Sequence, residues 1–292
     1  MSLELKSPCK INLLLNILGK REDGFHELET VMHPVAYYDL LNFEMAGNNV
    51  QLTCSDATLA TDSKNLVYRA ADAFLKRAGI GQGVRIHLEK RIPHAAGLGG
   101  GSGNAATTLL ALNQLFAFAF SENELTEIAA SLGSDVPFFL QNCPALATGR
   151  GEQIHALDSF PALDGLYILL VHPGFGISTP WSYRELSKFP DALHGRRGRA
   201  EKLISLLQNG PLEMAAPEFY NSLEAPALKK FPLLALIQEF FRSQGALVAM
   251  MSGSGSATFA LVRGKSAAET MLERFRVKFG EKFWTTIVPL SE

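Results

Sequence analysis

The chain has few cysteines, little net charge and no hydrophobic run long enough to cross a bilayer. Three cysteines, Cys9, Cys54 and Cys143, occur in 292 residues, and they are too far apart to have the spacing of a metal site. Sparse cysteines in a sequence with no signal-peptide pattern favour a reducing compartment, so we expect a cytoplasmic protein. The longest apolar stretch, residues 107–120, is interrupted by polar side chains, so we expect no membrane partner.

The chain also lacks an excess of charge of either sign, since its net charge is only −2 at pH 7. A protein that binds nucleic acid through counterion release carries a strong basic excess, so we expect no nucleic-acid partner. Hydrophobic residues make up 47% of the chain and charged residues 19%, which is ordinary for a globular protein. A chain of this length can form one large domain or two of medium size.

Hydrophobic patterning predicts strands and helices in an irregular order. The predicted strands cover residues 3–6, 10–18, 27–42, 84–88, 165–172, 246–251 and 257–262. The predicted helices cover residues 65–78, 105–120, 122–131, 200–208, 233–244 and 266–278. Ser63 and Ser121 are the expected N-caps of the first and third of these helices. Because no regular βαβ rhythm is present, the expected fold class is α+β.

Two places are candidate domain boundaries, Pro161 and the polar stretch 190–199. We favour Pro161, which begins a new segment ahead of a buried strand. The predicted domains are therefore residues 1–161 and residues 162–292.

A glycine-rich loop is the most informative stretch of the sequence. Between Pro93 and Ala106 the chain reads Pro-His-Ala-Ala-Gly-Leu-Gly-Gly-Gly-Ser-Gly-Asn-Ala-Ala, and an apolar run follows at once. Such a loop at the start of a helix exposes backbone N–H groups where the helix dipole favours an anion. The pattern predicts a phosphate-binding loop, and the alternative is a glycine-rich turn with Ser102 as an N-cap.

The two most familiar phosphate loops do not fit this sequence. A Walker loop requires G-x-x-x-x-G-K-[ST], but the Gly264-Lys265-Ser266 triplet has Phe259 where the first glycine belongs. A dinucleotide loop requires G-x-G-x-x-G, and the frame that starts at Gly97 ends in Ser102.

The pattern Pro-x-x-x-Gly-Leu-Gly-(Gly-Gly)-Ser instead resembles the phosphate loop of the GHMP kinases, which are named for galactokinase, homoserine kinase, mevalonate kinase and phosphomevalonate kinase. Three further blocks resemble one branch of this family, whose substrate is 4-diphosphocytidyl-2-C-methyl-D-erythritol. They are Lys10–Leu28, Gly133–Phe139 and Met251–Phe259, and they occur in the expected order. Several separate blocks make the resemblance more specific than one loop.

The resemblance implies a two-domain GHMP kinase fold. The N-terminal, ATP-binding domain would be like domain 2 of ribosomal protein S5, and the C-terminal, substrate-binding domain would be ferredoxin-like. The implied reaction is ATP-dependent phosphorylation of the C2 hydroxyl of the diphosphocytidyl substrate, in the non-mevalonate pathway to isopentenyl diphosphate. ATP and Mg²⁺ are the implied cofactors, and we expect a monomer or a weak homodimer.

The resemblance implies two catalytic residues, Lys10 and Asp135, acting on the same hydroxyl. Asp135 would serve as general base or orient the hydroxyl. The alternative for Asp135 is an N-cap of a helix near residues 136–140. The Lys10 ammonium would stabilise developing charge, and the alternative is an edge-strand lysine that extends to water.

Phe25 and His26 are the expected signal of substrate specificity. An aromatic ring beside a hydrogen-bonding ring suits stacking on a flat base and contact with its edge. The resemblance implies that this base is cytosine and that Tyr183 supplies a second aromatic ring. The family usually has Tyr where this chain has Phe25, and stacking survives that change. The alternatives are core packing for Phe25 and a structural role for His26.

Asn12, Gly253 and Gly255 complete the substrate-binding residues that the resemblance implies. Asn12 would hydrogen-bond the substrate, or else lie in a turn network. The two glycines resemble a second anion-binding loop near the substrate diphosphate, and a tight β-turn explains the same residues without a ligand.

The loop and the start of the first helix supply the implied ATP-binding residues. These are Asn65, Leu66, Pro93, Gly97, Leu98, Gly99, Gly100, Gly101, Ser102 and Gly103. The family usually has a second Ser or a similar small residue where this chain has Gly103. Ser102 is therefore the candidate hydroxyl for a phosphate or a metal ion.

Two rival functions remain open on the sequence. One is another GHMP kinase of the mevalonate or homoserine type, which the aromatic residues disfavour because a small substrate has no base to bind. The other is a non-catalytic nucleotide- or RNA-binding module, since S5-like folds occur there, and the acidic balance disfavours it.

Overall fold

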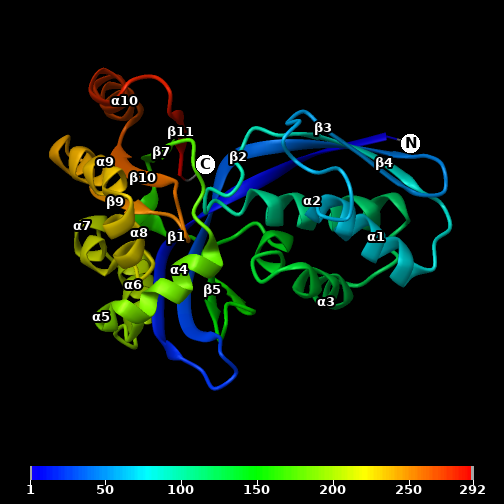
Figure 1. Cartoon of the computed structure of the whole chain (residues 1–292), viewed down its shortest axis with the longest axis horizontal. Coiled ribbons are helices and arrows are strands. Elements are labelled where there is room, and N and C mark those ends of the chain that lie inside the picture. The colour runs from blue at the N-terminus through cyan, green and yellow to red at the C-terminus, as the bar shows by residue number, and fades with distance from the viewer. Residues whose placement is uncertain (1, 291–292) are drawn as a thin grey trace. The chain divides into compact units, whose positions relative to one another are not determined.

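The computed structural model describes residues 2–290, and its chain forms two compact units (Figure 1). Unit 1 comprises Met1–Cys9, Tyr37–Ile92 and Gly99–Asn142. Unit 2 comprises Lys10–Ala36, Pro93–Leu98 and Cys143–Glu292. Each unit is built from three separate segments of the chain. The predicted boundary at Pro161 instead divides the chain into two consecutive domains, and it stays a prediction.

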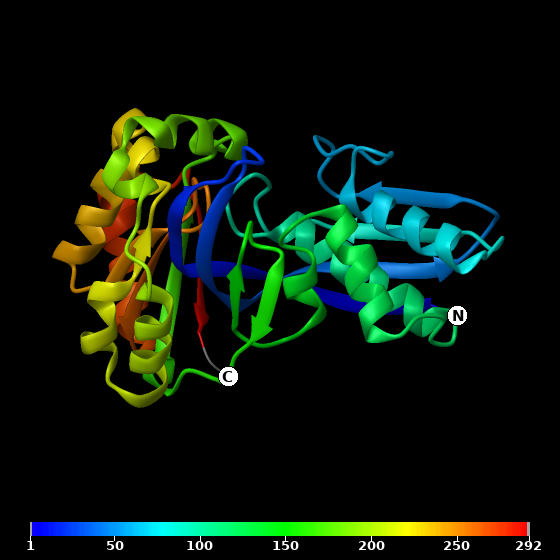
Figure 2. The ribbon, with the colours of Figure 1, turned by 90° about the horizontal axis from the view of Figure 1, so that it is seen from below.

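Unit 1 is a layer of helices on a sheet. Its strands are the first part of β1 (Ser2–Lys20), the second part of β2 (His26–Met45), β3 (Val50–Cys54) and β4 (Val84–Glu89), in the order β3-β4-β2-β1. Its helices are α1 (Leu66–Ala78), α2 (Gly100–Leu115), α3 (Glu122–Leu132) and the short 3₁₀ helix η1 (Pro137–Leu140). Figures 1 and 2 show α1, α2 and α3 together on one side of β2, β3 and β4.

Unit 2 contains an antiparallel sheet with the order β11-β7-β10-β9. Its strands are β7 (Leu166–His172), β9 (Val248–Met251), β10 (Thr258–Arg263) and β11 (Trp284–Pro289). Helices α9 (Pro232–Ser243) and α10 (Lys265–Phe279) pack their apolar faces on this sheet around Phe240, Phe241 and Phe275 (Figure 2). The order β7-α9-β9-β10-α10-β11 is the ferredoxin-like arrangement that the resemblance implies.

A long helical insertion separates β7 from α9. Its members are α4 (Thr179–Glu185), η3 (Leu186–Lys188), α5 (Pro190–Leu193), α6 (Arg199–Asn209), α7 (Leu212–Ala215), η4 (Ala216–Glu218), β8 (Tyr220–Asn221) and α8 (Glu224–Lys230). Within unit 2, β8 pairs parallel with β1, and β5 (Ala145–Thr148) pairs with β2 and β6 (Gln153–Ala156). A short 3₁₀ helix, η2 (Pro161–Leu163), precedes β7.

Of the two predicted helix N-caps, one is correct and one is wrong. Ser121 caps α3 in a capping box with Glu124, as predicted. The expected cap Ser63 is wrong, because the side chain of Asn65 accepts from the Val67 N–H at 2.9 Å and caps α1.

The helix expected over residues 105–120 is shifted, since α2 runs from Gly100 to Leu115. It starts early because the glycines themselves form its first turn. It ends early because Asn113 hydrogen-bonds the backbone of Phe120 and Phe118 takes a positive φ of 60°. The two strands expected at residues 3–6 and 10–18 are one strand, β1. No helix within residues 2–290 is long and apolar enough to span a bilayer.

Candidate active site

Lys10 is a buried lysine in the middle of strand β1. Only 3% of it is exposed, so the alternative of a lysine that extends to water is wrong. Its Nζ donates a 2.6 Å hydrogen bond to Oδ1 of Asn12, which is 3% exposed. Because side chains alternate along a strand, residues two apart share a face, and β1 presents the ammonium and the amide together.

The first part of the glycine loop belongs to unit 2 and lies against these residues. The Lys10 N–H donates to the Leu98 carbonyl at 2.9 Å. Gly97 has a φ of +81°, and a Cβ there would lie 2.1 Å from the Ser252 carbonyl oxygen. A Cβ on Gly253 would lie 3.0 Å from the Gly97 carbonyl oxygen. Within unit 2, the close approach of these two loops therefore requires glycine at position 97.

The 252–256 loop is also joined to helix α4. The hydroxyls of Thr179 and Ser254 are 2.8 Å apart, which links the loop to the helix that carries Tyr183. Asn221 Nδ2 donates to the carbonyls of Met251 at 2.9 Å and Gly253 at 2.8 Å. No sequence pattern singles out Asn221, because its partners lie about thirty residues away along the chain.

A Cβ on Gly255 would lie 2.5 Å from Met251 Sδ, and its φ is +86°. Gly253 likewise has a positive φ of 56°. The tight turn that was the alternative for both glycines is therefore present, and their role toward a diphosphate stays a prediction.

Three rings of the predicted base-binding group lie in unit 2. The His26 and Tyr183 rings are paired, with centroids 5.1 Å apart and planes tilted by 40°. Phe25 is 55% exposed, so the core-packing alternative for it is wrong. The Arg150 guanidinium lies 4.8 Å from the Phe25 ring centroid. Burial, and then the charge of Lys20, lowers the pKa of His26, which favours the neutral imidazole with one donor and one acceptor.

In unit 1, helix α2 begins in the glycine loop without a side-chain cap. Its N-cap is Gly99, which has a φ of 69°, so Ser102 is not the N-cap. The Gly103 N–H already bonds the Gly99 carbonyl at 2.8 Å. The N–H groups of the preceding residues Gly100, Gly101 and Ser102 begin the helix, where intrahelical acceptors are missing. This is the geometry in which a helix start binds an anion.

Position 103 has no room for a side chain. A Cβ there would lie 2.6 Å from the Pro8 carbonyl oxygen and 3.1 Å from Ser7 Oγ. Close packing of α2 on β1 therefore explains why this chain has glycine at that position. At Gly101 a Cβ would lie 3.6 Å from Leu66 Cδ1, so the loop and the start of α1 are neighbours in unit 1.

A buried carboxylate that the sequence analysis missed fixes the start of α2. Asp39 is fully buried, and its Oδ1 accepts from the N–H groups of Arg91 at 2.7 Å and Ile92 at 2.8 Å. Its Oδ2 accepts from Asn104 Nδ2 at 2.9 Å and pairs with Lys90. Asp39 thereby joins the segment after β4 to the first turns of α2.

Asp135 lies in unit 1 between α3 and η1. The N-cap residue of η1 is Val136, which directly follows Asp135. The alternative that Asp135 is the N-cap residue of this helix is therefore wrong, and its role in catalysis stays a prediction.

Pro93 completes the group, and it lies in unit 2 at the entry to the loop. The predicted residues are thus brought together in two sets. Unit 2 contains Lys10, Asn12, Phe25, His26, Pro93, Gly97, Leu98, Tyr183, Gly253 and Gly255, and unit 1 contains Asn65, Leu66, Gly99, Gly100, Gly101, Ser102, Gly103 and Asp135.

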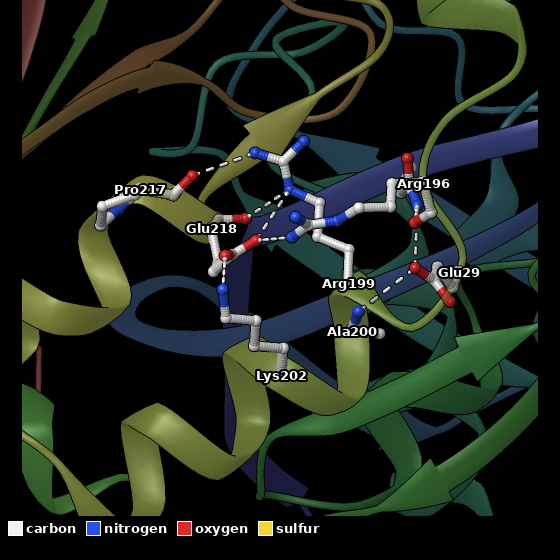
Figure 3. A network of polar contacts seen from close by, with 8 residues as sticks. Glu29, Arg196, Arg199, Ala200, Lys202, Pro217 and Glu218 are labelled. Atoms are coloured by element: carbon white, nitrogen blue, oxygen red, sulfur yellow. Dashed lines mark hydrogen bonds and ion pairs between the residues drawn. The ribbon is translucent and has the colours of Figure 1, made fainter.

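A second polar network holds the segment that leads into α6 (Figure 3). Glu218 is 5% exposed, and Arg196, Arg199 and Lys202 all point toward its carboxylate. Burial acts to raise the pKa of Glu218, but the ion pair with Lys202 and the two guanidinium charges outweigh it, so the pKa lies below its usual value. Glu29 accepts from a backbone N–H in the first turn of α6 at 3.2 Å. This network is structural, since it ties α6 to β2 and η4.

Two family models match the chain. They are described as GHMP kinases N terminal domain, over residues 65–142, and GHMP kinases C terminal, over residues 189–282. Among residues 2–290, no group of three or more His, Cys, Asp or Glu side chains is arranged to hold a metal ion.

Curated relatives cover nearly the whole chain. A protein of Caldicellulosiruptor bescii named 4-diphosphocytidyl-2-C-methyl-D-erythritol kinase is 39% identical over 287 residues, which is 97% of this chain and 98% of its own. A protein of the same name from Syntrophus aciditrophicus is 41% identical over 269 residues, or 91% of this chain and 92% of its own.

Solved structures give the same grouping. A crystal structure of 4-(cytidine 5'-diphospho)-2C-methyl-D-erythritol kinase is 37% identical, has a TM-score of 0.82 and covers 98% of both chains. A crystal structure of mevalonate kinase has a TM-score of 0.76 at 13% identity and covers 98% of both chains, so it shares the fold. The chain has the two-domain GHMP kinase fold, and it belongs to the GHMP kinases, among the 4-diphosphocytidyl-2-C-methyl-D-erythritol kinases.

Proposed function

We propose that this chain transfers the γ-phosphoryl group of ATP to the C2 hydroxyl of 4-diphosphocytidyl-2-C-methyl-D-erythritol, giving the 2-phosphate and ADP. The reaction is a step of the non-mevalonate pathway to isopentenyl diphosphate. The observation that carries the proposal is the near-full-length identity of 39% to a kinase of that name. Membership of a kinase family implies the use of ATP.

Two residues carry the chemistry in this proposal. Asp135 accepts the proton of the C2 hydroxyl or orients it, and the Lys10 ammonium stabilises the negative charge that develops on the alcohol oxygen. The burial of Lys10 supports this role, because a desolvated ammonium interacts more strongly with a nearby anion than one in water.

The start of α2 would hold the phosphates of ATP. The N–H groups of Gly100, Gly101 and Ser102 are the donors, and Asn65 and Leu66 contact the adenine. Mg²⁺ is held in proteins by oxygen ligands, often by substrate phosphates with one or two protein groups. The half-buried Ser102 hydroxyl at the start of α2 suits such a metal, which would neutralise phosphate charge during transfer.

The aromatic group in unit 2 supports the diphosphocytidyl substrate over a smaller one. Phe25 and Tyr183 would stack on cytosine and His26 would bond its edge, whereas mevalonate and homoserine have no base for these rings to contact. Asn12 would bond the polyol, and Gly253 and Gly255 would lie near the diphosphate. We place the enzyme in the cytoplasm as a monomer or weak homodimer, without nucleic-acid or membrane partners.

The proposal is tested by an ADP-release assay with Mg²⁺ and three acceptors, namely 4-diphosphocytidyl-2-C-methyl-D-erythritol, mevalonate and homoserine. We expect turnover of the first alone, and loss of that turnover in Lys10→Met, which keeps the unbranched side chain without its charge. Turnover of mevalonate or homoserine in preference to the first would assign the chain to a different substrate. No ADP release with any acceptor would favour the non-catalytic module.

A further inference from the structure

A third buried polar residue, Thr30, is hydrogen-bonded to the Lys10–Asn12 pair through Asn12. Asn12 Nδ2 donates to the hydroxyl of Thr30 at 2.8 Å, and Thr30 lies on β2 with only 6% of its surface exposed. The Thr30 hydroxyl in turn donates to the Leu14 carbonyl at 2.5 Å. All four residues belong to unit 2.

The donors and acceptors in this series of hydrogen bonds allow only one orientation of the Asn12 amide. A threonine hydroxyl has a single proton, so a hydroxyl that donates to the Leu14 carbonyl must accept from Asn12. Asn12 therefore presents its NH₂ group to Thr30 and its carbonyl oxygen to Lys10. An ammonium only donates, so this is the amide orientation that Lys10 requires.

We propose that Thr30 is a positioning residue for phosphoryl transfer, since its hydroxyl fixes the Asn12 amide that holds the Lys10 ammonium. The inference rests on the proposed function, because it assumes that Lys10 acts in the reaction. Thr30 touches neither substrate nor ATP in this scheme. Its contribution is to prevent the Asn12 amide from turning its NH₂ group toward Lys10, where two donors would face each other.

The matched substitutions are Thr30→Ser, which keeps the hydroxyl, and Thr30→Ala and Thr30→Val, which remove it. Because small misplacements of reacting groups cost up to about 100-fold in rate, we expect both hydroxyl-free variants to lower kcat by about 10-fold to 100-fold. We expect KM for ATP to change by less than about twofold, since the Lys10–Asn12–Thr30 contacts act at the acceptor hydroxyl and not at the nucleotide. Thr30→Ser should restore kcat to within about threefold of the wild-type value, because the hydroxyl returns to the same backbone position.

Thr258→Val is the control for removal of a buried threonine hydroxyl. Thr258 is fully buried on β10, and its Oγ1 has no hydrogen-bond partner within residues 2–290. We expect its kcat to equal that of the wild type. If Thr30→Val does not fold, the comparison of Thr30→Ala with Thr30→Ser carries the test, since these two differ by one hydroxyl.

A double substitution tests whether Thr30 acts through Asn12. If it does, the kcat of Asn12→Ala/Thr30→Ala equals that of Asn12→Ala alone, because the amide to be positioned is already gone. Additive losses, or a Thr30→Ala enzyme with wild-type kcat, would overturn the inference. Failure of the proposed function has a different signature, namely a wild-type protein without turnover or a Lys10→Met variant as active as the wild type.

Discussion

At the scale of single residues, a structural and a chemical role of Asp135 differ in the size of the effect that each predicts. A capping aspartate would contribute about 1 kcal/mol to stability. The N-cap position of η1 is Val136, so Asp135 is not the N-cap residue. A general base instead contributes roughly 10²–10⁴ in rate.

Asp135→Asn is therefore expected to separate activity from stability. The amide keeps the shape of the carboxylate but accepts no proton, so kcat should fall by about two orders of magnitude or more. The midpoint of urea unfolding should stay near the wild-type value. A variant that unfolds early and loses activity in proportion would indicate a structural role, and near-normal turnover would remove Asp135 from the mechanism.

His33 gives a second prediction at the residue scale. It is 8% exposed, and one ring nitrogen lies 2.7 Å from the Pro34 carbonyl oxygen. Burial lowers the pKa of His33 to about 4, although the Pro34 carbonyl acts to raise it. The folded protein therefore keeps the ring neutral at pH values where the unfolded chain protonates it. The free energy of unfolding therefore carries no penalty from burial of the neutral His33 ring above pH 6.5, and it declines as the pH falls from 6.5 toward 4.

The gap between the ordinary pKa of 6.5 and about 4 corresponds to about 3 kcal/mol at most. Urea unfolding at pH 7, 6, 5 and 4 should show that the wild type loses up to about this much more stability than His33→Gln. Carboxyl groups that titrate in the same range affect both proteins and cancel in the comparison. The exposed His155 supplies the control, since His155→Gln should follow the wild-type curve. Parallel curves for wild type and His33→Gln would show that burial does not exclude the proton.

At the scale of elements, local chemistry was predictable and long-range chemistry was not. The capping box at Ser121 is contained in four consecutive residues, so the start of α3 was predicted correctly. The end of α2 depends on Asn113 reaching the backbone of Phe120, and a hydrophobic pattern does not reveal that bond. The glycines were expected to form a loop before the helix, because glycine has low helix propensity. They form its first turn instead, and at Gly103 the packing against Pro8 leaves no room for a side chain.

That close packing predicts a difference between two glycines of one helical turn. Gly103→Ser places a Cβ only 2.6 Å from the Pro8 carbonyl oxygen, so the strand or the helix must shift. We expect a loss of about 1–3 kcal/mol in the free energy of unfolding, as for other overpacked sites. Gly101→Ser, whose Cβ would make an ordinary contact at 3.6 Å with Leu66, should cost little stability. Equal stability of the two variants would mean that β1 yields easily at Pro8.

At the scale of the whole molecule, the site residues that lie within sequence motifs were predictable. The residues that connect one motif to another through hydrogen bonds were not. Lys10 and Asn12 stand in one strand, and the period of two placed them on one face. Thr30, Asp39 and Asn221 have partners that depend on strand register or on loops far along the chain. Nothing in a single sequence marks such residues, since a buried threonine or aspartate has the same local pattern as an exposed one.

The weak net charge of −2 also makes a prediction for the whole molecule, because it separates a small-molecule kinase from an RNA-binding module. Binding that neutralises only two phosphates loses about tenfold in affinity between 50 and 200 mM salt, whereas six to ten phosphate contacts lose about 10³–10⁵. We therefore expect calorimetric titration to give a Kd for CDP that changes by no more than about tenfold over this range.

Tyr183→Ala should weaken CDP binding by about 1–3 kcal/mol, the contribution of one base stacked on an aromatic ring. If a single-stranded RNA competes with CDP and its affinity falls steeply with salt, phosphate contacts distributed over the surface dominate, and the base-binding role of His26 and Tyr183 fails.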